Sequence, residues 1–318
     1  MSKITVSDLE THILLPREEK IAVSNELDAY GFRAILVAHY SRRATRKPLA
    51  AWLHSWKYWD LRRDIGIAIG NKRKQTPVLV PTAKLRTQLL KLHYEVVELA
   101  PSPWALATVC NFLPQPTRSF KILCVIPKRN TAEIHKDTYA YLDFISDNYL
   151  VHEPVVLLPA SYRDNREFNR MLKRLGLRYV FGPAGDDKNG LTRMSQIFRH
   201  FEFVVSGHFG THLPFAAING CRVGIIGPYI EAIDSRNPWY PEYRDLISFC
   251  EMKKTYGYLF ADTLEKVDFN KKFFEEQSGC GLINDYSVWA RIAPLMGWTL
   301  GGLFSNYFSK MISIFSAR

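Results

Sequence analysis

A segment rich in glycine and histidine, residues 206–212, holds residue types suited to binding an anion. It follows the apolar run 203–205 and precedes an alanine-containing stretch that stops at Asn219-Gly220, a pattern that predicts strand, glycine loop, short helix and strand. Glycine lets the backbone approach a ligand closely, and the first N–H groups of a helix suit a phosphate. A turn-facing imidazole can contact phosphate too. We predict a phosphate site formed by Ser206, Gly207, His208, Gly210, Thr211 and His212, with a plain βαβ turn as the alternative.

Two adjacent cations follow another predicted strand. Lys128 and Arg129 come directly after the apolar run 120–126 and Pro127. Stabilising a departing diphosphate is an electrostatic task that such cations can perform. They are predicted to bind the same anion, although paired cations at a strand end also occur as ordinary surface residues.

Two histidines in the first third of the chain are candidates for a general base, because imidazole titrates near neutral pH. His54 is the first candidate, and it lies in the aromatic stretch 52–59, where Trp56 could stack on a sugar. His39 is the second, and the basic residues Arg42 and Arg43 follow it. These two cations and Trp56 are predicted to bind an acceptor. A solvated basic loop and a packed aromatic cluster are the competing interpretations.

Alternating strands and helices must position these residues. In the second half the predicted strands are 120–126, 154–158, 178–181, 201–205 and 222–226, and the helices between them are 131–148, 165–175, 191–200 and 211–219. In the first half the predicted strands are 34–38, 77–80 and 94–99, with a helix at 82–92 and an interdomain linker in the proline-containing stretch 101–116. This order predicts parallel sheets built from βαβ units, which bind ligands beyond the carboxyl ends of their strands.

Length and composition are those of a packed globular protein. The 318 residues suggest two domains, and the net charge of +11 is concentrated before residue 120, which favours an anionic partner. The five cysteines form no C-x-x-C pair, so neither a zinc cluster nor a disulfide framework is expected. No signal peptide or membrane span is expected. Residues 300–315 carry an apolar stripe at helical spacing, which could lie on a membrane or dock on the first domain.

The segment 203–225 resembles the donor-side loop of GT-B glycosyltransferases of capsule and lipopolysaccharide synthesis, and the tracts 78–99 and 120–127 agree with that resemblance in order. It implies an α/β fold of two Rossmann-like domains facing a cleft: an acceptor domain at 1–116, a nucleotide-sugar donor domain at 117–297 and an amphipathic C-terminal helix at 298–318. A sugar would pass from a nucleotide-activated donor to a glycan or lipid-linked acceptor, with no cofactor and no metal. The acidic E-x₆-E signature of the commonest retaining branch is not found, which favours inversion.

Other functions fit the same architecture. A nucleotide-sugar epimerase, a polysaccharide pyruvyl transferase and a non-catalytic binding subunit are the alternatives. The basic residues are scattered and accompany no nucleic-acid motif, so no nucleic-acid partner is expected. The expected location is the cytoplasm, with a peripheral contact at the inner face of the membrane.

Overall fold

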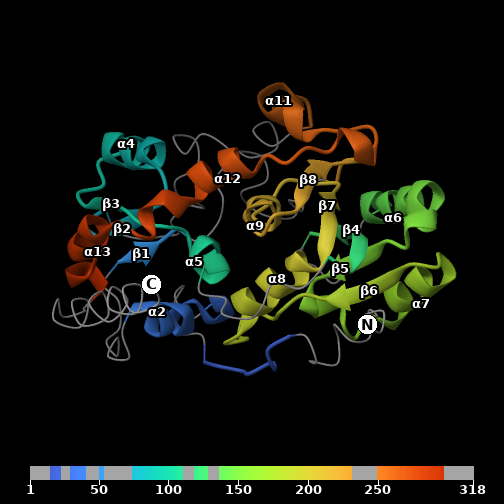
Figure 1. Cartoon of the computed structure of the whole chain (residues 1–318), viewed down its shortest axis with the longest axis horizontal. Coiled ribbons are helices and arrows are strands. Elements are labelled where there is room, and N and C mark those ends of the chain that lie inside the picture. Colours follow the sequence, from blue (N-terminus) through green and yellow to red (C-terminus); the bar gives the residue numbers. More distant parts are fainter. Residues whose placement is uncertain are drawn as a thin grey trace, which may run out of the picture.

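The computed structural model describes residues 15–22, 29–40, 50–53, 74–109, 118–127, 136–230 and 249–296. It confirms the predicted α/β class with two separate parallel sheets, a smaller sheet in the first half of the chain and a larger one in the second half. Figure 1 shows the two sheets at opposite ends of the molecule, with helix α5 between them.

The larger sheet has five parallel strands in the order β6-β5-β4-β7-β8. In chain order the strands are β4 (Phe120–Val125), β5 (Val155–Leu158), β6 (Arg178–Phe181), β7 (Phe201–Ser206) and β8 (Arg222–Ile225). The chain winds outward from β4 to β6, then crosses back past β4 to form β7 and β8. Counted from β4 this is the 3-2-1-4-5 order of a Rossmann-type sheet, whose switch point lies between β4 and β7.

Helices cover both faces of this sheet, which explains why its strands are continuous apolar runs. On one face α6 (Lys136–Tyr149) and α7 (Arg166–Arg174) pack over alternate strand residues such as Cys124 and Val156. On the other face α8 (Gly190–Arg199) and α9 (His212–Ile218) pack over the residues between them, such as Leu123.

The smaller sheet consists of β1 (Ala51–Trp52), β2 (Val78–Val80) and β3 (Val97–Leu99), all parallel. Helix α4 (Ala83–Lys91) joins β2 to β3, and the Thr82 side chain caps it by accepting a hydrogen bond from the Leu85 N–H. This βαβ unit is the one predicted at 77–99.

Later elements cross back to the smaller sheet. After α11 (Phe249–Tyr256), helix α12 (Lys271–Ser278) packs on α9, and α13 (Tyr286–Ile292) packs on β3. Trp289 of α13 lies with its ring 6.4 Å from that of Trp52. Short 3-10 turns complete the described part: η1 (Ala29–Gly31), η3 (Leu150–His152), η4 (Ala160–Tyr162), η5 (Gly257–Leu259), η6 (Leu264–Lys266), η7 (Cys280–Leu282) and η8 (Pro294–Met296).

One predicted strand was wrong. Residues 34–38 belong to helix α2 (Phe32–Tyr40), in which Phe32, Ile35 and Leu36 are buried at the i, i+3, i+4 spacing of a helix. A short apolar run does not by itself distinguish a strand from a buried helix. His39 therefore lies in the last turn of α2 rather than after a strand.

The proline-containing stretch 101–116 also differs from expectation, because it begins with helix α5 (Pro103–Val109), whose Trp104 and Leu106 are buried against neighbouring helices. Proline at the first helical position is favourable there, since its missing N–H has no helical partner. The domain limits 1–116 and 117–297 stay predictions. The predicted helix at 298–318 lies outside the described residues.

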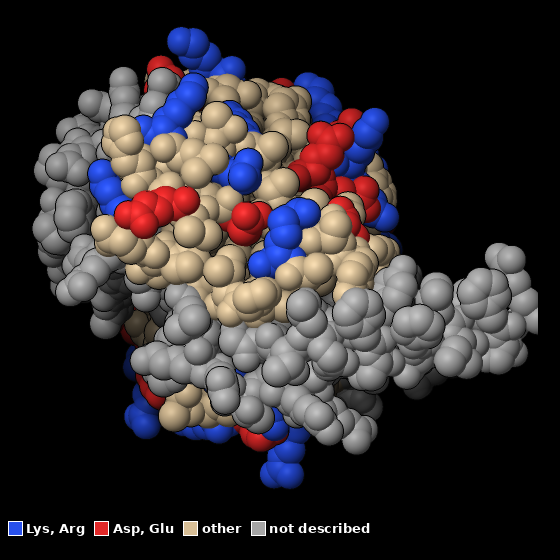
Figure 2. Space-filling model, turned by 90° about the vertical axis from the view of Figure 1, so that its left-hand side faces the viewer, with Lys and Arg blue, Asp and Glu red and all other residues tan. Residues whose placement is uncertain are grey.

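The described surface does not concentrate charge of one sign on the face that bears the smaller sheet. Figure 2 shows basic and acidic side chains side by side over it. None of the described helices combines the length and apolar character needed to cross a bilayer.

Candidate functional site

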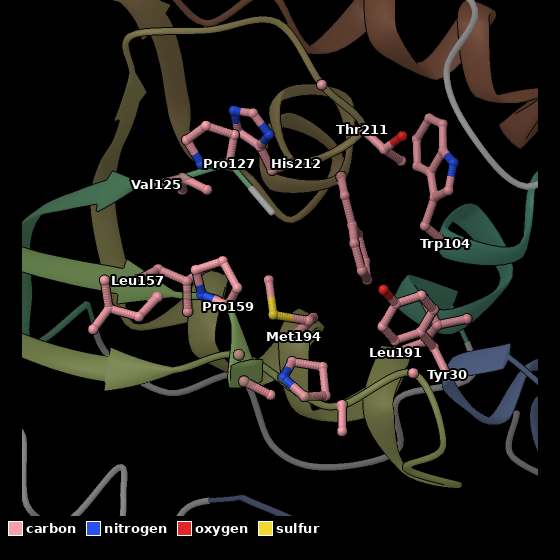
Figure 3. Close-up of a pocket in the computed structure, with 18 of the residues that line it drawn as sticks. Tyr30, Trp104, Val125, Pro127, Leu157, Pro159, Leu191, Met194, Thr211 and His212 are labelled. Carbon is pink, nitrogen blue, oxygen red and sulfur yellow. The ribbon is translucent and has the colours of Figure 1, made fainter. Parts of the chain in front are cut away.

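A cavity of about 590 Å³ lies at the carboxyl edge of the larger sheet. The residues that end β4 and β5, including Val125, Pro127 and Pro159, form one side of it, and the loop after β7 forms another. Because β4 and β7 flank the switch point of the sheet, this is where an open α/β fold leaves room for a ligand. Figure 3 shows Leu157 and Pro159 facing Tyr30 and Trp104 across the cavity.

The loop after β7 is held in place by Ser206. Its side chain is completely buried and donates a hydrogen bond to the Val125 carbonyl oxygen, with an O···O distance of 2.9 Å. The same hydroxyl accepts from the His208 N–H and lies 2.6 Å from His208 Nδ1. A hydroxyl has one proton to donate, so the His208 Nδ1 must carry the proton between these two atoms. Ser206 thereby fixes the tautomer and orientation of His208.

His208 and His212 lie against each other at the cavity wall, with ring centroids 4.6 Å apart. Gly210 permits this arrangement, since a Cβ there would lie 2.8 Å from His212 Nδ1. Burial lowers the pKa of His212 to about 3, and its Nε2 is buried with no hydrogen-bond partner. His212 is therefore a neutral imidazole at physiological pH, with one polar atom left unsatisfied.

Gly207 is required for a different reason. A Cβ at this position would lie 2.7 Å from the Pro228 carbonyl oxygen and 2.9 Å from the ring of Tyr141. The glycine thus lets the β7 loop pack against the segment after β8 rather than against a ligand.

The opposite wall comes from the first half of the chain. Tyr30, Phe32 and Trp104 reach the cavity from η1, α2 and α5. The indole Nε1 of Trp104 is buried without a hydrogen-bond partner. Trp104 and His212, which line the cavity from opposite sides, thus each hold a buried nitrogen without a hydrogen-bond partner among the described residues.

Residues 15–22 and Tyr30 are anchored to the loop between β6 and α8. The Tyr30 N–H donates to the Gly185 carbonyl oxygen at 2.7 Å, and the Lys188 N–H donates to that of Glu19 at 2.8 Å. A Cβ on Gly31, whose φ is +75°, would collide with the Lys188 carbonyl oxygen. These contacts seat Tyr30 in the wall of the cavity, beside the loop between β6 and α8.

The predicted site residues divide into three groups. His208, Gly210, Thr211 and His212 line the cavity, and their role in binding a phosphate stays a prediction. Ser206 and Gly207 lie behind the lining. The other predicted residues lie outside the described ranges: Arg42, Arg43, His54, Trp56, Lys128 and Arg129. His39 lies in α2, but its side chain is not described.

Sequence reasoning missed the aromatic wall. The segment that contains Tyr30 and the helix that contains Trp104 gave no functional signal. The available clue was the apolar run 104–107 directly after Pro103. It is a helix start that is buried on every side, because residues 103–107 are all buried.

The described lining carries no charged side chain. Its large surfaces come from Phe198, Phe215, Met194, Leu191 and the aromatic wall. Within the described ranges, no group of three or more His, Cys, Asp or Glu side chains is placed to hold a metal ion. Within the described ranges this lining therefore offers a ligand apolar faces and a few neutral hydrogen-bonding groups.

Comparisons with known proteins give distant likenesses. Neither a protein-family model nor a curated protein sequence matches the chain. Among solved structures, a mutant of TarM from S. aureus, in complex with fondaparinux, α-GlcNAc-glycerol and UDP, is similar over 77% of this chain and 49% of that one, with 14% identity and a TM-score of 0.35. A second TarM structure is similar over 69% of this chain and 43% of that one, with 11% identity and a TM-score of 0.33.

The catalytic domain of a cholesterol-α-glucosyltransferase from Helicobacter pylori is similar over 51% of this chain and 98% of that domain, with 16% identity and a TM-score of 0.27. The chain thus spans about half the length of the TarM chains that it resembles. TM-scores this low do not by themselves establish a common fold.

Proposed function

We propose that the protein is a glycosyltransferase that moves a sugar from a nucleotide-activated donor to a glycan or lipid-linked acceptor in surface-polysaccharide synthesis. Its substrates would bind in the cavity at the carboxyl edge of the larger sheet. The observation that carries the proposal is the composition of this cavity. Its floor comes from the switch point of a Rossmann-type sheet, and its opposite wall comes from the half of the chain that contains the smaller sheet. A transferase needs such a place, where two substrates bound by different parts of the chain can meet.

The donor would bind on the larger sheet. The loop containing His208 and Thr211 would face its diphosphate, and Lys128 and Arg129, which follow β4, would stabilise the negative charge that develops on it. The aromatic wall suits the C–H faces of a sugar. His212 would present a neutral nitrogen to another polar group of the donor.

The acceptor would come from the side of the smaller sheet. His54, or His39 in its place, would take the proton from the acceptor hydroxyl. The hydroxyl oxygen would then form a bond to the anomeric carbon as the bond from that carbon to the phosphate oxygen breaks. The bonding electron pair would leave with the nucleoside diphosphate. Attack opposite the leaving group inverts the configuration, and no step in this scheme requires a metal ion.

A thermal-shift screen against UDP-, GDP-, dTDP- and CMP-sugars tests the proposal. A ligand that binds only the folded protein raises the melting temperature, so one class of donor should give a shift. The variants Trp104→Phe, His212→Asn and Lys128→Ala should reduce that shift, whereas Lys84→Ala on the distant helix α4 should not. If the donor shifts the melting temperature of all four variants equally, the donor does not bind in this cavity.

Product analysis separates the transferase from its alternatives. Incubation of the protein with the stabilising donor alone should give slow hydrolysis, and addition of an acceptor should give a glycosylated product. Conversion of the donor sugar without an acceptor would identify an epimerase, and binding without any turnover would identify a non-catalytic subunit. Either result would overturn the proposal.

A further inference from the structure

Helix α7 carries a row of basic side chains at the outer edge of the larger sheet. Arg166, Arg170, Lys173 and Arg174 are all exposed. No ion pair joins any of the four to another residue in the described ranges. Residues 163–178 hold six cations and two acids, a net charge of +4. Figure 1 places α7 at the end of the molecule opposite the smaller sheet.

The row contains like charges that repel one another. Arg166 and Arg170, and likewise Arg170 and Arg174, are like charges at the i, i+4 spacing, which destabilises a helix. Glu167 is the one acid within α7. Lys173 and Arg174 gain some stabilisation from the carboxyl end of the helix dipole, but Arg166 in the first turn does not. An anionic partner would relieve this repulsion.

Exposed aliphatic side chains lie beside the end of the row. Val151 is 83% exposed and Leu150 is 46% exposed, both in η3. η3 adjoins the end of α7, since a Cβ on Gly176 would lie 3.5 Å from Leu150 Cδ1. Ser146 of α6 donates a hydrogen bond to the Leu175 carbonyl oxygen at 3.0 Å. These contacts hold η3 and the last turn of α7 side by side.

The combination identifies the kind of partner. Cations that meet anionic headgroups, next to aliphatic side chains that can enter the acyl boundary, are the chemistry of an interfacial membrane contact. The phosphates of a nucleic acid would pair with the cations, but the exposed aliphatic side chains of Val151 and Leu150 would find no apolar partner there. Glu167 on α7 and Asp147 on α6 oppose the attraction, so binding should need an anionic surface rather than any lipid surface.

We infer that the α7 row and η3 together form a docking surface for an anionic lipid membrane. This surface is separate from the cavity, and the inference does not depend on the proposed reaction. If the protein docks on a membrane through α7, strand β6, at the edge of the larger sheet, would be the strand nearest the bilayer. Residues 163–165 separate helix α7 from η4, whose Ala160 and Ser161 line the cavity, so a lipid-linked substrate could reach the cavity from this side.

Co-sedimentation with lipid vesicles tests the docking surface. The full chain should sediment with vesicles of phosphatidylglycerol and phosphatidylcholine but not with vesicles of phosphatidylcholine alone, and added salt should release it. The fourfold variant Arg166→Gln, Arg170→Gln, Lys173→Gln and Arg174→Gln should bind at least tenfold more weakly. The separate variant Leu150→Ser with Val151→Ser should also bind more weakly, although its charge is unchanged.

A charge-matched variant supplies the control. Substituting Gln for the exposed Lys84, Lys91, Lys253 and Lys254 of α4 and α11 removes the same net charge from elsewhere on the surface and should leave vesicle binding within about twofold. Equal losses in the control and the α7 variant would overturn the inference. So would undiminished binding by the α7 variant, or RNA that binds α7 while anionic vesicles do not. Melting temperatures and donor-induced shifts of all variants establish that they are folded and that the cavity is intact.

Discussion

Arg193 Nε lies 3.2 Å from Asp187 Oδ2, and the two side chains are only 5% and 1% exposed. Asp187 Oδ1 accepts hydrogen bonds from the N–H groups of Glu19 and Asn189. Arg193 donates to the Pro16 carbonyl oxygen at 2.6 Å. The pair therefore joins residues 15–22 to the loop that seats Tyr30 in the cavity.

Neutralising one member of this pair should destabilise the protein. Asp187→Asn keeps an acceptor for the two N–H groups but leaves the Arg193 charge buried without its partner, which should cost about 3 kcal/mol of unfolding free energy. Urea denaturation measures the loss. The double variant Asp187→Asn with Arg193→Met removes both charges and should recover part of it. Equal stability of the single variant and the unaltered protein would show that the pair contributes nothing.

Removing the Ser206 hydroxyl should weaken ligand binding more than it weakens the fold. In Ser206→Ala the His208 Nδ1–H and the Val125 carbonyl oxygen lose their partner, at a cost of about 1–3 kcal/mol, and the imidazole loses its fixed orientation. Ser195→Ala is the matched control, because Ser195 is also buried and its hydroxyl bonds to Asn219 Oδ1 at 2.7 Å away from the cavity lining. Calorimetric titration with the stabilising donor should show an affinity loss of about tenfold for Ser206→Ala and little change for the control.

The buried imidazole of His212 predicts an acid-sensitive fold. Its pKa is lowered from 6.5 to about 3 by burial, so below pH 6.5 the unfolded chain takes up a proton that the folded chain does not. The stability associated with neutral His212 is fully present above pH 6.5 and is lost as the pH falls towards 3, by about 1.4 kcal/mol per pH unit.

Urea denaturation at several pH values measures this slope. Burial also lowers the pKa of His200, which acts in the same direction, so the informative quantity is the difference between the unaltered protein and His212→Leu. That variant should lose a large part of the slope and keep the His200 contribution. An unchanged slope would mean that the site of protonation is elsewhere.

A single methyl group should separate the two histidines. In Gly210→Ala the added Cβ would lie 2.8 Å from His212 Nδ1, so the His212 ring must move away from His208 and change the cavity wall. Gly257→Ala is the control, because nothing lies within 4 Å of a Cβ at that position. The donor-induced thermal shift should fall in the first variant and persist in the second.

The larger sheet was predictable because its signal is local. Each of its strands is a short apolar run followed within a few residues by glycine, proline or a polar turn, and the helices between them carry their own apolar period. At α7 the sequence also supplies a cap, Asn165, whose side chain accepts a hydrogen bond from the Phe168 N–H. Residues 34–38 misled because Ile35 and Leu36 are apolar neighbours in either a strand or a helix, and only the burial of Phe32 with them reveals the helical period.

The cavity was predictable on one side. His208, Thr211 and His212 follow a strand in sequence, so their place at the carboxyl edge follows from the order of elements. Tyr30 and Trp104 reach the same cavity through packing between segments far apart in the chain, such as Gly31 against Lys188. No local pattern encodes such a contact. Gly207 shows the converse: its place in the loop was predictable, but its requirement for close packing on Pro228 was not.

Ser102 and Ser278 mark the places where the chain leaves and rejoins the smaller sheet, and the Ser102 N–H donates to the Ser278 carbonyl oxygen at 2.8 Å. Next to them a Cβ on Gly279 would lie 2.9 Å from the Pro81 carbonyl oxygen. The two crossings between the sheets are therefore tied directly to each other. Because Gly279 has a φ of +68° and no room for a Cβ, a larger residue there would strain this double crossing while leaving the cavity lining untouched.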